Sequence, residues 1–173
     1  QEASIAVLPF VNMSSDEENE YFADGLTEQL LDELANLSGL QVPARTSSFQ
    51  FKDRNEDIRQ IGKLLGVNYI LEGSVQFDSP RNRIKITAQL INANNGHHLW
   101  SETYEDDFEE IFKIQEDVSR KVASKLRVEL LPEEDKELSK KPTENTDAYK
   151  LFMEARQYSQ LREDAPLKKA IEL

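Results

Sequence analysis

The apolar residues of this chain change their spacing twice along the sequence, and this constrains the fold more than any other feature. Between Tyr21 and Leu37 they recur every three or four residues, which indicates an amphipathic helix. From Tyr69 to Leu90 they alternate with mostly polar residues, which indicates strands with one buried face. From Phe108 to Leu126 the helical spacing returns. This succession predicts helices packed on a sheet.

Shorter segments complete the predicted order of elements. Ser4–Leu8 is an apolar run typical of a central strand, and Pro9 favours its end because proline lacks the N–H of the ladder. The other expected elements are a strand at Leu40–Ala44, a short helix at Ile58–Leu65, and turns at Asp78–Asn82 and Asn94–Gly96. The order is therefore β-α-β-α-β-β-β-α. It predicts an α/β (α+β) fold with a mixed sheet of about five strands, followed by an α-helical hairpin.

The last part of the chain differs from the first in composition. Pro132 is expected to end the long helix, and Glu133–Asn145 holds eight charged residues and one bulky apolar residue, Leu138. From Thr146 to Leu173 small and aromatic residues recur at helical spacing and resemble the opening of a tetratricopeptide repeat, cut short of its ~34 residues. We expect a folded domain at 4–131, a charged linker at 132–145 and a truncated helical hairpin at 146–173.

Composition excludes several classes of partner. The net charge is −12 and no run of basic residues occurs, which argues against binding to nucleic acid. No apolar segment approaches the ~18–20 residues of a membrane span, so membrane insertion is not expected. Cysteine is absent, which rules out disulfides and thiolate metal sites. The chain starts at Gln1 and is interpreted as a piece of a longer protein, with cytoplasmic and periplasmic locations both open.

A search for catalytic chemistry gives no active site. The phosphate-binding, dinucleotide-binding and nucleophile-elbow motifs are all absent from the sequence. The two histidines, His97 and His98, are neighbours on an expected strand and would point to opposite faces. No catalytic residue, metal site or cofactor is therefore predicted, and the fragment is not expected to be an enzyme.

One group of polar residues is the candidate site. Arg45 follows the second expected strand, and three hydroxyl residues come directly after it: Thr46, Ser47 and Ser48. Asp24 and Glu28 lie one helical turn apart, so they share a face of the first helix. Arg45 could bind a small anion with the hydroxyls, or could form a structural ion pair with Asp24 or Glu72. The ion pair is the preferred interpretation.

Five segments in order resemble the amino-terminal-domain-like family of TolB, also called FlgO-like. They are Ser4–Phe10 (SIAVLPF), Glu20–Glu28 (EYFADGLTE), Tyr69–Val75 (YILEGSV), Ile84–Ile91 (IKITAQLI) and His98–Tyr104 (HLWSETY). The resemblance covers Ser4 to Leu131. It implies a bacterial domain between an upstream output domain, such as a cyclase or a winged-helix DNA-binding domain, and a downstream tetratricopeptide array.

These observations together predict a non-catalytic regulatory or protein-interaction module of a bacterial signalling protein. Its partners would be other proteins or neighbouring domains, bound through the helical-repeat region, and a homodimer stays open. The alternative function is that of a sensor for a small anionic ligand near Arg45.

Overall fold

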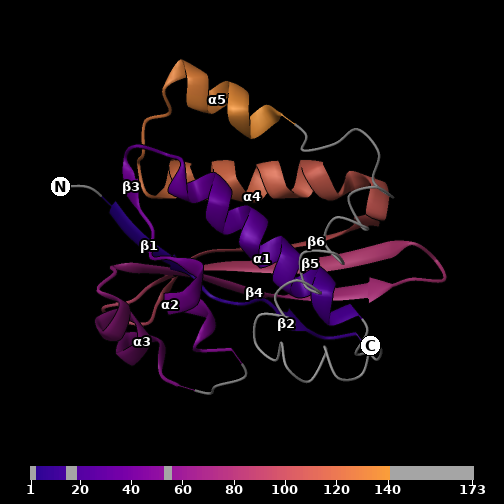
Figure 1. Cartoon of the computed structure of the whole chain (residues 1–173), viewed down its shortest axis with the longest axis horizontal. Helices are drawn as coiled ribbons and strands as arrows, with labels where there is room; N and C mark the ends of the chain where they lie inside the picture. The colour runs from indigo at the N-terminus through magenta and orange to yellow at the C-terminus, as the bar shows by residue number, and fades with distance from the viewer. Residues whose placement is uncertain (1–2, 15–18, 53–55, 141–173) are drawn as a thin grey trace, which may run out of the picture.

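The computed structural model describes residues 3–14, 19–52 and 56–140, and these form a mixed α/β sheet with helices packed on it (Figure 1). Six strands make one sheet in the order β3-β1-β4-β5-β6, with β2 paired to β4. The strands are β1 (Ala3–Val7), β2 (Val11–Asn12), β3 (Leu40–Gln41), β4 (Tyr69–Asp78), β5 (Arg83–Asn92) and β6 (His98–Asp107). The helices are α1 (Glu20–Ala35), α2 (Arg45–Phe49), α3 (Ile58–Leu65), η2 (Phe108–Glu110), α4 (Ile111–Lys125) and α5 (Pro132–Ser139). The predicted fold class is confirmed.

The sheet is parallel on one side and antiparallel on the other. β1 runs parallel to β3 and β4, whereas β4, β5 and β6 form two hairpins of ten-residue strands. Both hairpin turns lie where the sequence predicts them. Asn82 and Gly96 adopt positive φ angles of 54° and 76° there, a conformation that asparagine and glycine tolerate best.

Pro9 interrupts the first strand, as predicted, but the pairing to β4 resumes after it. β1 ends at Val7, and β2 begins at Val11 opposite Ser74 of β4. Between them the backbone N–H of Phe10 donates a hydrogen bond to Thr27 Oγ1 at 2.9 Å. Because Phe10 donates to a side chain of α1 and not to a neighbouring strand, the interruption of the strand links the sheet to this helix.

The main core lies between the sheet and the pair of helices α1 and α4, which cover the same face (Figure 1). Phe22 of α1, Phe77 of β4 and Phe108 pack as a triangle of rings with centroids 5.2–5.5 Å apart. A smaller core on the opposite face joins α3 to the sheet through Ile61 and Ile70. The aromatic triangle holds the start of α1 against the strand that both helices cover.

Two expected boundaries are wrong. The strand expected at Leu40–Ala44 is limited to Leu40–Gln41, because Pro43 offers no ladder donor and the Ala44 carbonyl accepts from the N–H groups of the next helix. Arg45 therefore begins α2 instead of following a strand end.

The charged segment expected as a linker from residue 132 is a helix over Pro132–Ser139. Pro132 suits a first helical position, and Glu134 accepts from the backbone N–H groups of Leu131 and Ser38 at 2.9 and 2.7 Å. Leu138 is buried in the main core and anchors α5 to it. The expected hairpin at 146–173 lies outside the described residues.

Candidate functional site

The candidate site is a line of carboxylates on α1 that faces α2 and the turn after it. Glu20, Asp24 and Glu28 are spaced four residues apart, so their side chains lie along one face of the helix. Asp24 and Glu28 are buried, with 9% and 8% of their surface exposed. We call the group joined by ion pairs the α1 polar cluster: Glu20, Asp24, Glu28, Arg45 and Lys52.

Arg45 pairs with Glu28, and not with Asp24 or Glu72 as the sequence suggested. Its Nε lies against Glu28 Oε1, although without the alignment of a hydrogen bond. The guanidinium stacks on Phe49 of its own helix, 4.0 Å from the ring centroid. The preferred interpretation of Arg45 as a structural ion-pair residue agrees with this geometry, but the partner was wrong.

Lys52 is the residue of the cluster that sequence reasoning missed. Its Nζ lies 2.7 Å from Asp24 Oδ2 and 3.0 Å from Glu20 Oε2, so one cation serves two carboxylates. Burial raises the pKa of Asp24, and the hydrogen bond from Lys52 opposes that rise. The spacing offered a signal. The three carboxylates of α1 recur every four residues and so form a line on the helix. Such a line needs more than one cation beside it, and Lys52 follows Arg45 by only seven residues.

The three hydroxyl residues after Arg45 do not converge on one point. Thr46 is exposed, Ser47 is half-buried, and Ser48 is fully buried. Among the described residues, Ser48 Oγ and Asp24 Oδ1 are buried atoms without a hydrogen-bond partner. A helix presents successive side chains in different directions, so the expected anion cradle of adjacent hydroxyls does not form.

Glu72 lies outside the α1 polar cluster. Its neighbour Leu71 belongs to the core under α1 and α4, and successive residues of a strand face opposite sides. Glu72 therefore lies on the other face of the sheet from α1. Burial raises its pKa, and His98 counteracts this effect. The sequence could not place Glu72, because the register of β4 against the helices was needed.

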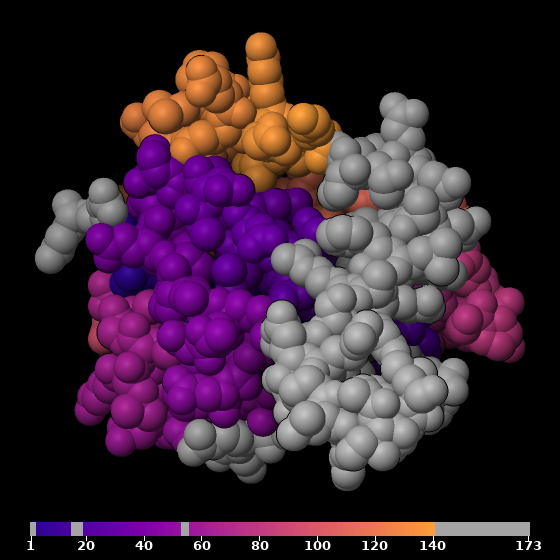
Figure 2. Space-filling view, in the orientation of Figure 1, coloured from indigo at the N-terminus to yellow at the C-terminus, as the bar shows by residue number. Residues whose placement is uncertain are grey.

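A second polar region occupies the other end of α1. Ser119 Oγ of α4 donates a 2.7 Å hydrogen bond to Glu33 Oε2, and burial raises the pKa of Glu33 to about 7. Burial is the main cause of this pKa; the nearby Glu116 and Asp32 also raise it, and the hydrogen bond from Ser119 lowers it. Glu33 lines a groove of about 520 Å3 between α1 and α5, and in Figure 2 the orange surface of α5 meets the purple surface that contains α1. Nothing in the sequence pattern singled out this carboxylate.

The described residues contain no group of three histidine, aspartate or glutamate side chains arranged to hold a metal ion. Within the same part of the chain, no helix combines the length and apolar character needed to cross a membrane.

Comparison with known proteins identifies the sequence family. The family model described as "HilA/YgeH-like transcriptional regulator, second domain" matches residues 1–124. A protein of Rhizobium meliloti (strain 1021), named "Putative adenylate cyclase 3", is 46% identical over 154 residues. That alignment covers 89% of this chain and 26% of the relative, so the chain spans about a quarter of the relative's length.

Solved structures support the fold. TolB from Acinetobacter baumannii superposes with a TM-score of 0.53 at 16% identity, covering 73% of this chain and 28% of that one. The lipoprotein GNA1162 from Neisseria meningitidis gives a TM-score of 0.50 at 20% identity, covering 61% and 80%. At these identities the likeness concerns the fold alone, and it agrees with the TolB-like architecture that the sequence suggested.

Proposed function

This chain belongs to the family of HilA/YgeH-like transcriptional regulator second domains, and we propose from this membership that it is a non-catalytic regulatory module of a bacterial signalling protein. Domains of this kind occur in transcriptional regulators and in an adenylate cyclase homologue. A domain that occurs in proteins of different activity, transcriptional regulation and cyclic nucleotide synthesis, is better suited to control such an activity than to perform it. This shared occurrence is the observation that carries the proposal.

The chemistry of the α1 polar cluster supports the same function. Its two cations, Arg45 and Lys52, already contact three carboxylates of α1, and Asp24 and Glu28 are largely removed from water. Such a network joins α2 to α1 and resists rearrangement. We infer that the module is a rigid platform whose surface contacts other proteins or neighbouring domains, with the region after residue 140 as one route to them.

The test is an internal deletion in the full-length protein that carries this domain. Residues 3–140 are replaced by a flexible linker, and the output is measured as cyclic AMP formation or as transcription from a target promoter. We expect an output that persists but loses its normal regulation, and we expect the isolated chain to form no cyclic AMP. Formation of cyclic AMP by the isolated chain would refute the proposal, as would a full-length protein without any output domain.

A small anionic ligand near Arg45 is the second candidate function. It is favoured by Ser48 Oγ, a fully buried hydroxyl without a hydrogen-bond partner among the described residues. The charge balance opposes it, because three carboxylates surround two cations. Thermal unfolding with phosphate, nucleotides and dicarboxylates decides the matter. A rise in melting temperature that disappears in Arg45→Ala would support a sensor, since binding to the folded state alone stabilises it.

A further inference from the structure

The two edges of the sheet are built differently. The β3 edge is two residues long, and Pro43 follows it closely, so it offers little backbone for a further strand. The β6 edge is ten residues long and, in the described part of the chain, pairs only with β5. A long free edge presents a row of unpaired N–H and C=O groups. The β3 edge therefore offers little room for a further strand, whereas the β6 edge can accept one.

β6 lacks the proline and lysine residues that often protect an edge strand. Its pairing with β5 has one irregularity, opposite Leu90 and Ile91, at the start of β6. From Trp100 to Asp107 the register with β5 is continuous. Proteins commonly block edges with prolines, charged side chains, bulges or short strands, and acidic side chains exclude an acidic strand but not a basic one. The regular part of β6 keeps the geometry that an added strand needs.

The charge of β6 indicates the kind of strand that fits beside it. It carries four carboxylates and no lysine or arginine: Glu102, Glu105, Asp106 and Asp107. On its inner side, β5 places Arg83 3.0 Å from Asp107 and Lys85 3.5 Å from Glu105. Both carboxylate side chains are still 61% exposed, so they can accept a second cation. Opposite charges on facing strands stabilise pairing, and like charges oppose it.

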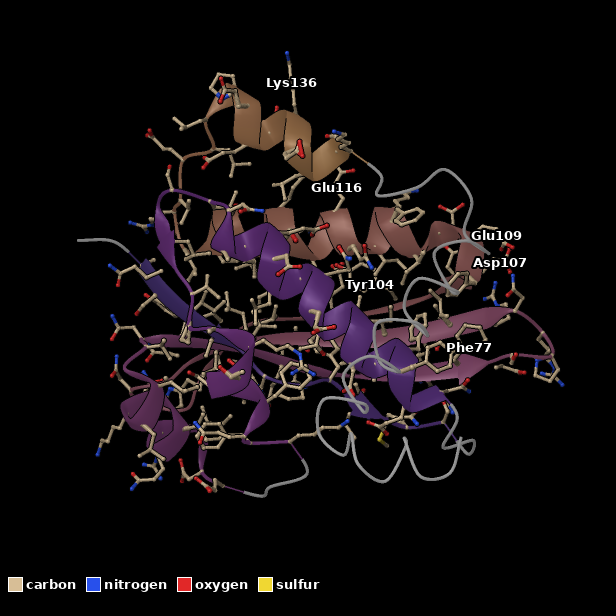
Figure 3. The ribbon with its side chains drawn as sticks, viewed as in Figure 1. Phe77, Tyr104, Asp107, Glu109, Glu116 and Lys136 are labelled. Carbon is tan, nitrogen blue, oxygen red and sulfur yellow. The ribbon has the colours of Figure 1, made fainter. Side chains whose placement is uncertain are left out.

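The helix layer leaves this edge accessible on one face of the sheet. Tyr104, labelled in Figure 3, points from β6 towards α4, and its hydroxyl donates a 2.5 Å hydrogen bond to Asp117. Tyr104 and its face are thus engaged with α4. Ser101, Thr103, Glu105 and Asp107 are exposed, and by strand alternation they lie on the opposite face. An incoming strand would find a polar, acidic face there.

We propose that the outer edge of β6 binds an extended, basic segment of a partner protein as a seventh strand of the sheet. Main-chain hydrogen bonds to β6 supply the affinity, and lysine or arginine side chains next to Glu105 and Asp107 supply the selectivity. A second copy of this chain fits less well, because two β6 strands would bring eight carboxylates together in molecules of net charge −12 each. This inference deepens the proposed function by giving the module a class of partner.

The experiment uses the whole 173-residue chain and a ten-residue peptide in which lysine alternates with threonine and valine. A matched peptide has glutamate at the lysine positions. We expect the lysine peptide to bind and to slow amide hydrogen exchange in β6, with the glutamate peptide inactive. The double variant Glu105→Gln/Asp107→Asn should weaken binding at least fivefold. Glu133→Gln/Glu137→Gln, which removes two exposed carboxylates of α5, should leave the affinity unchanged.

Unchanged exchange in β6 at saturating lysine peptide would overturn the proposal, and so would equal weakening by the two double variants. Sedimentation that shows a dimer, with β6 protected from exchange, would assign the edge to a second copy and also overturn it. The proposed function is tested separately by the deletion of residues 3–140, and it fails if regulation persists without them. If the deletion of residues 3–140 abolishes regulation while no peptide binds, the module acts through another surface.

Discussion

The two ends of α1 bury carboxylates in different surroundings. Asp24, near the start of the helix, contacts Lys52 at 2.7 Å, and its neighbour Glu28 contacts Arg45. Glu33, three turns from the start, contacts the hydroxyl of Ser119 and has two further carboxylates nearby. Burial raises the pKa of both Asp24 and Glu33, but a cation opposes it only at Asp24. A cation therefore offsets part of the cost of burying an ionised acid at Asp24, and no cation of the described residues does so at Glu33.

The largest effect is expected from removing Lys52, the cation that contacts two carboxylates. Lys52→Ala leaves Asp24 buried without its hydrogen-bonded partner, and it deprives Glu20 of the same cation. Loss of one member of a buried pair costs several kcal/mol, so we expect a loss of about 3 kcal/mol in the free energy of unfolding, since Lys52 is partly exposed. Urea denaturation at pH 7 measures it. Lys63→Ala, which removes an exposed lysine of α3, is the control.

If Lys52→Ala and Lys63→Ala are equally stable, the start of α1 gains nothing from its cations. The contrast between the two ends of the helix would then be lost.

At the other end of α1, a substitution is expected to stabilise the protein instead of destabilising it. The folded-state pKa of Glu33 is about 7, above the ordinary glutamate value of 4.5, so the folded protein holds this proton more tightly than the unfolded chain. Glu33 therefore does not lower the free energy of unfolding below pH 4.5. It lowers this free energy increasingly as the pH rises from 4.5 to 7, and by a constant amount above pH 7. Glu33→Gln should gain about 2 kcal/mol relative to wild type at pH 8, allowing for partial exposure.

The measurement is the free energy of unfolding of both proteins at intervals from pH 4.5 to pH 8.5. Their difference should grow across this range and then level off. Glu137→Gln, an exposed change that lines the same groove, serves as control and should show no such trend. A difference independent of pH would mean that Glu33 is ionised in the folded protein, as an ordinary surface acid is.

The sequence predicts the fold better than the site, for a physical reason. Periodicity reports which face of each element is apolar, and it located the hairpins and the long helix that ends near Leu126. It reported nothing on ion-pair partners, because Arg45 and Glu28 meet only through the way α2 crosses α1. It also misread the charged residues 132–139, where a single leucine and a well-capped start were enough to form α5.

Arg45→Ala is expected to have a smaller effect than Lys52→Ala. Arg45 contacts one carboxylate, Glu28, and stacks on Phe49, whereas Lys52 serves two acids. Loss of the Arg45 side chain leaves Glu28 buried and without this cation. We therefore expect the free energy of unfolding, measured in urea, to fall by about 1.5 kcal/mol. Arg59→Ala breaks an exposed pair with Asp57 and is the matched control, expected to change stability little. An Arg45→Ala variant as stable as Arg59→Ala would show that the pair is only a contact, and would revive the anionic-ligand hypothesis.

The smallest effect is expected from Ser119→Ala, and its pH dependence is the sharpest test of the contrast along α1. The Ser119 hydroxyl donates to Glu33 and lowers the pKa that burial raises, so its removal should move the ionisation of Glu33 above pH 7. We expect a loss of about 1 kcal/mol at pH 8, typical of one hydrogen bond, and a smaller loss at pH 5, where Glu33 is protonated. The double variant Ser119→Ala/Glu33→Gln supplies the control, because without an ionisable group at position 33 the cost of losing the hydroxyl should no longer depend on pH. If Ser119→Ala costs the same at pH 5 and pH 8 with Glu33 present, the hydroxyl does not stabilise the ionised form and does not lower the pKa of Glu33.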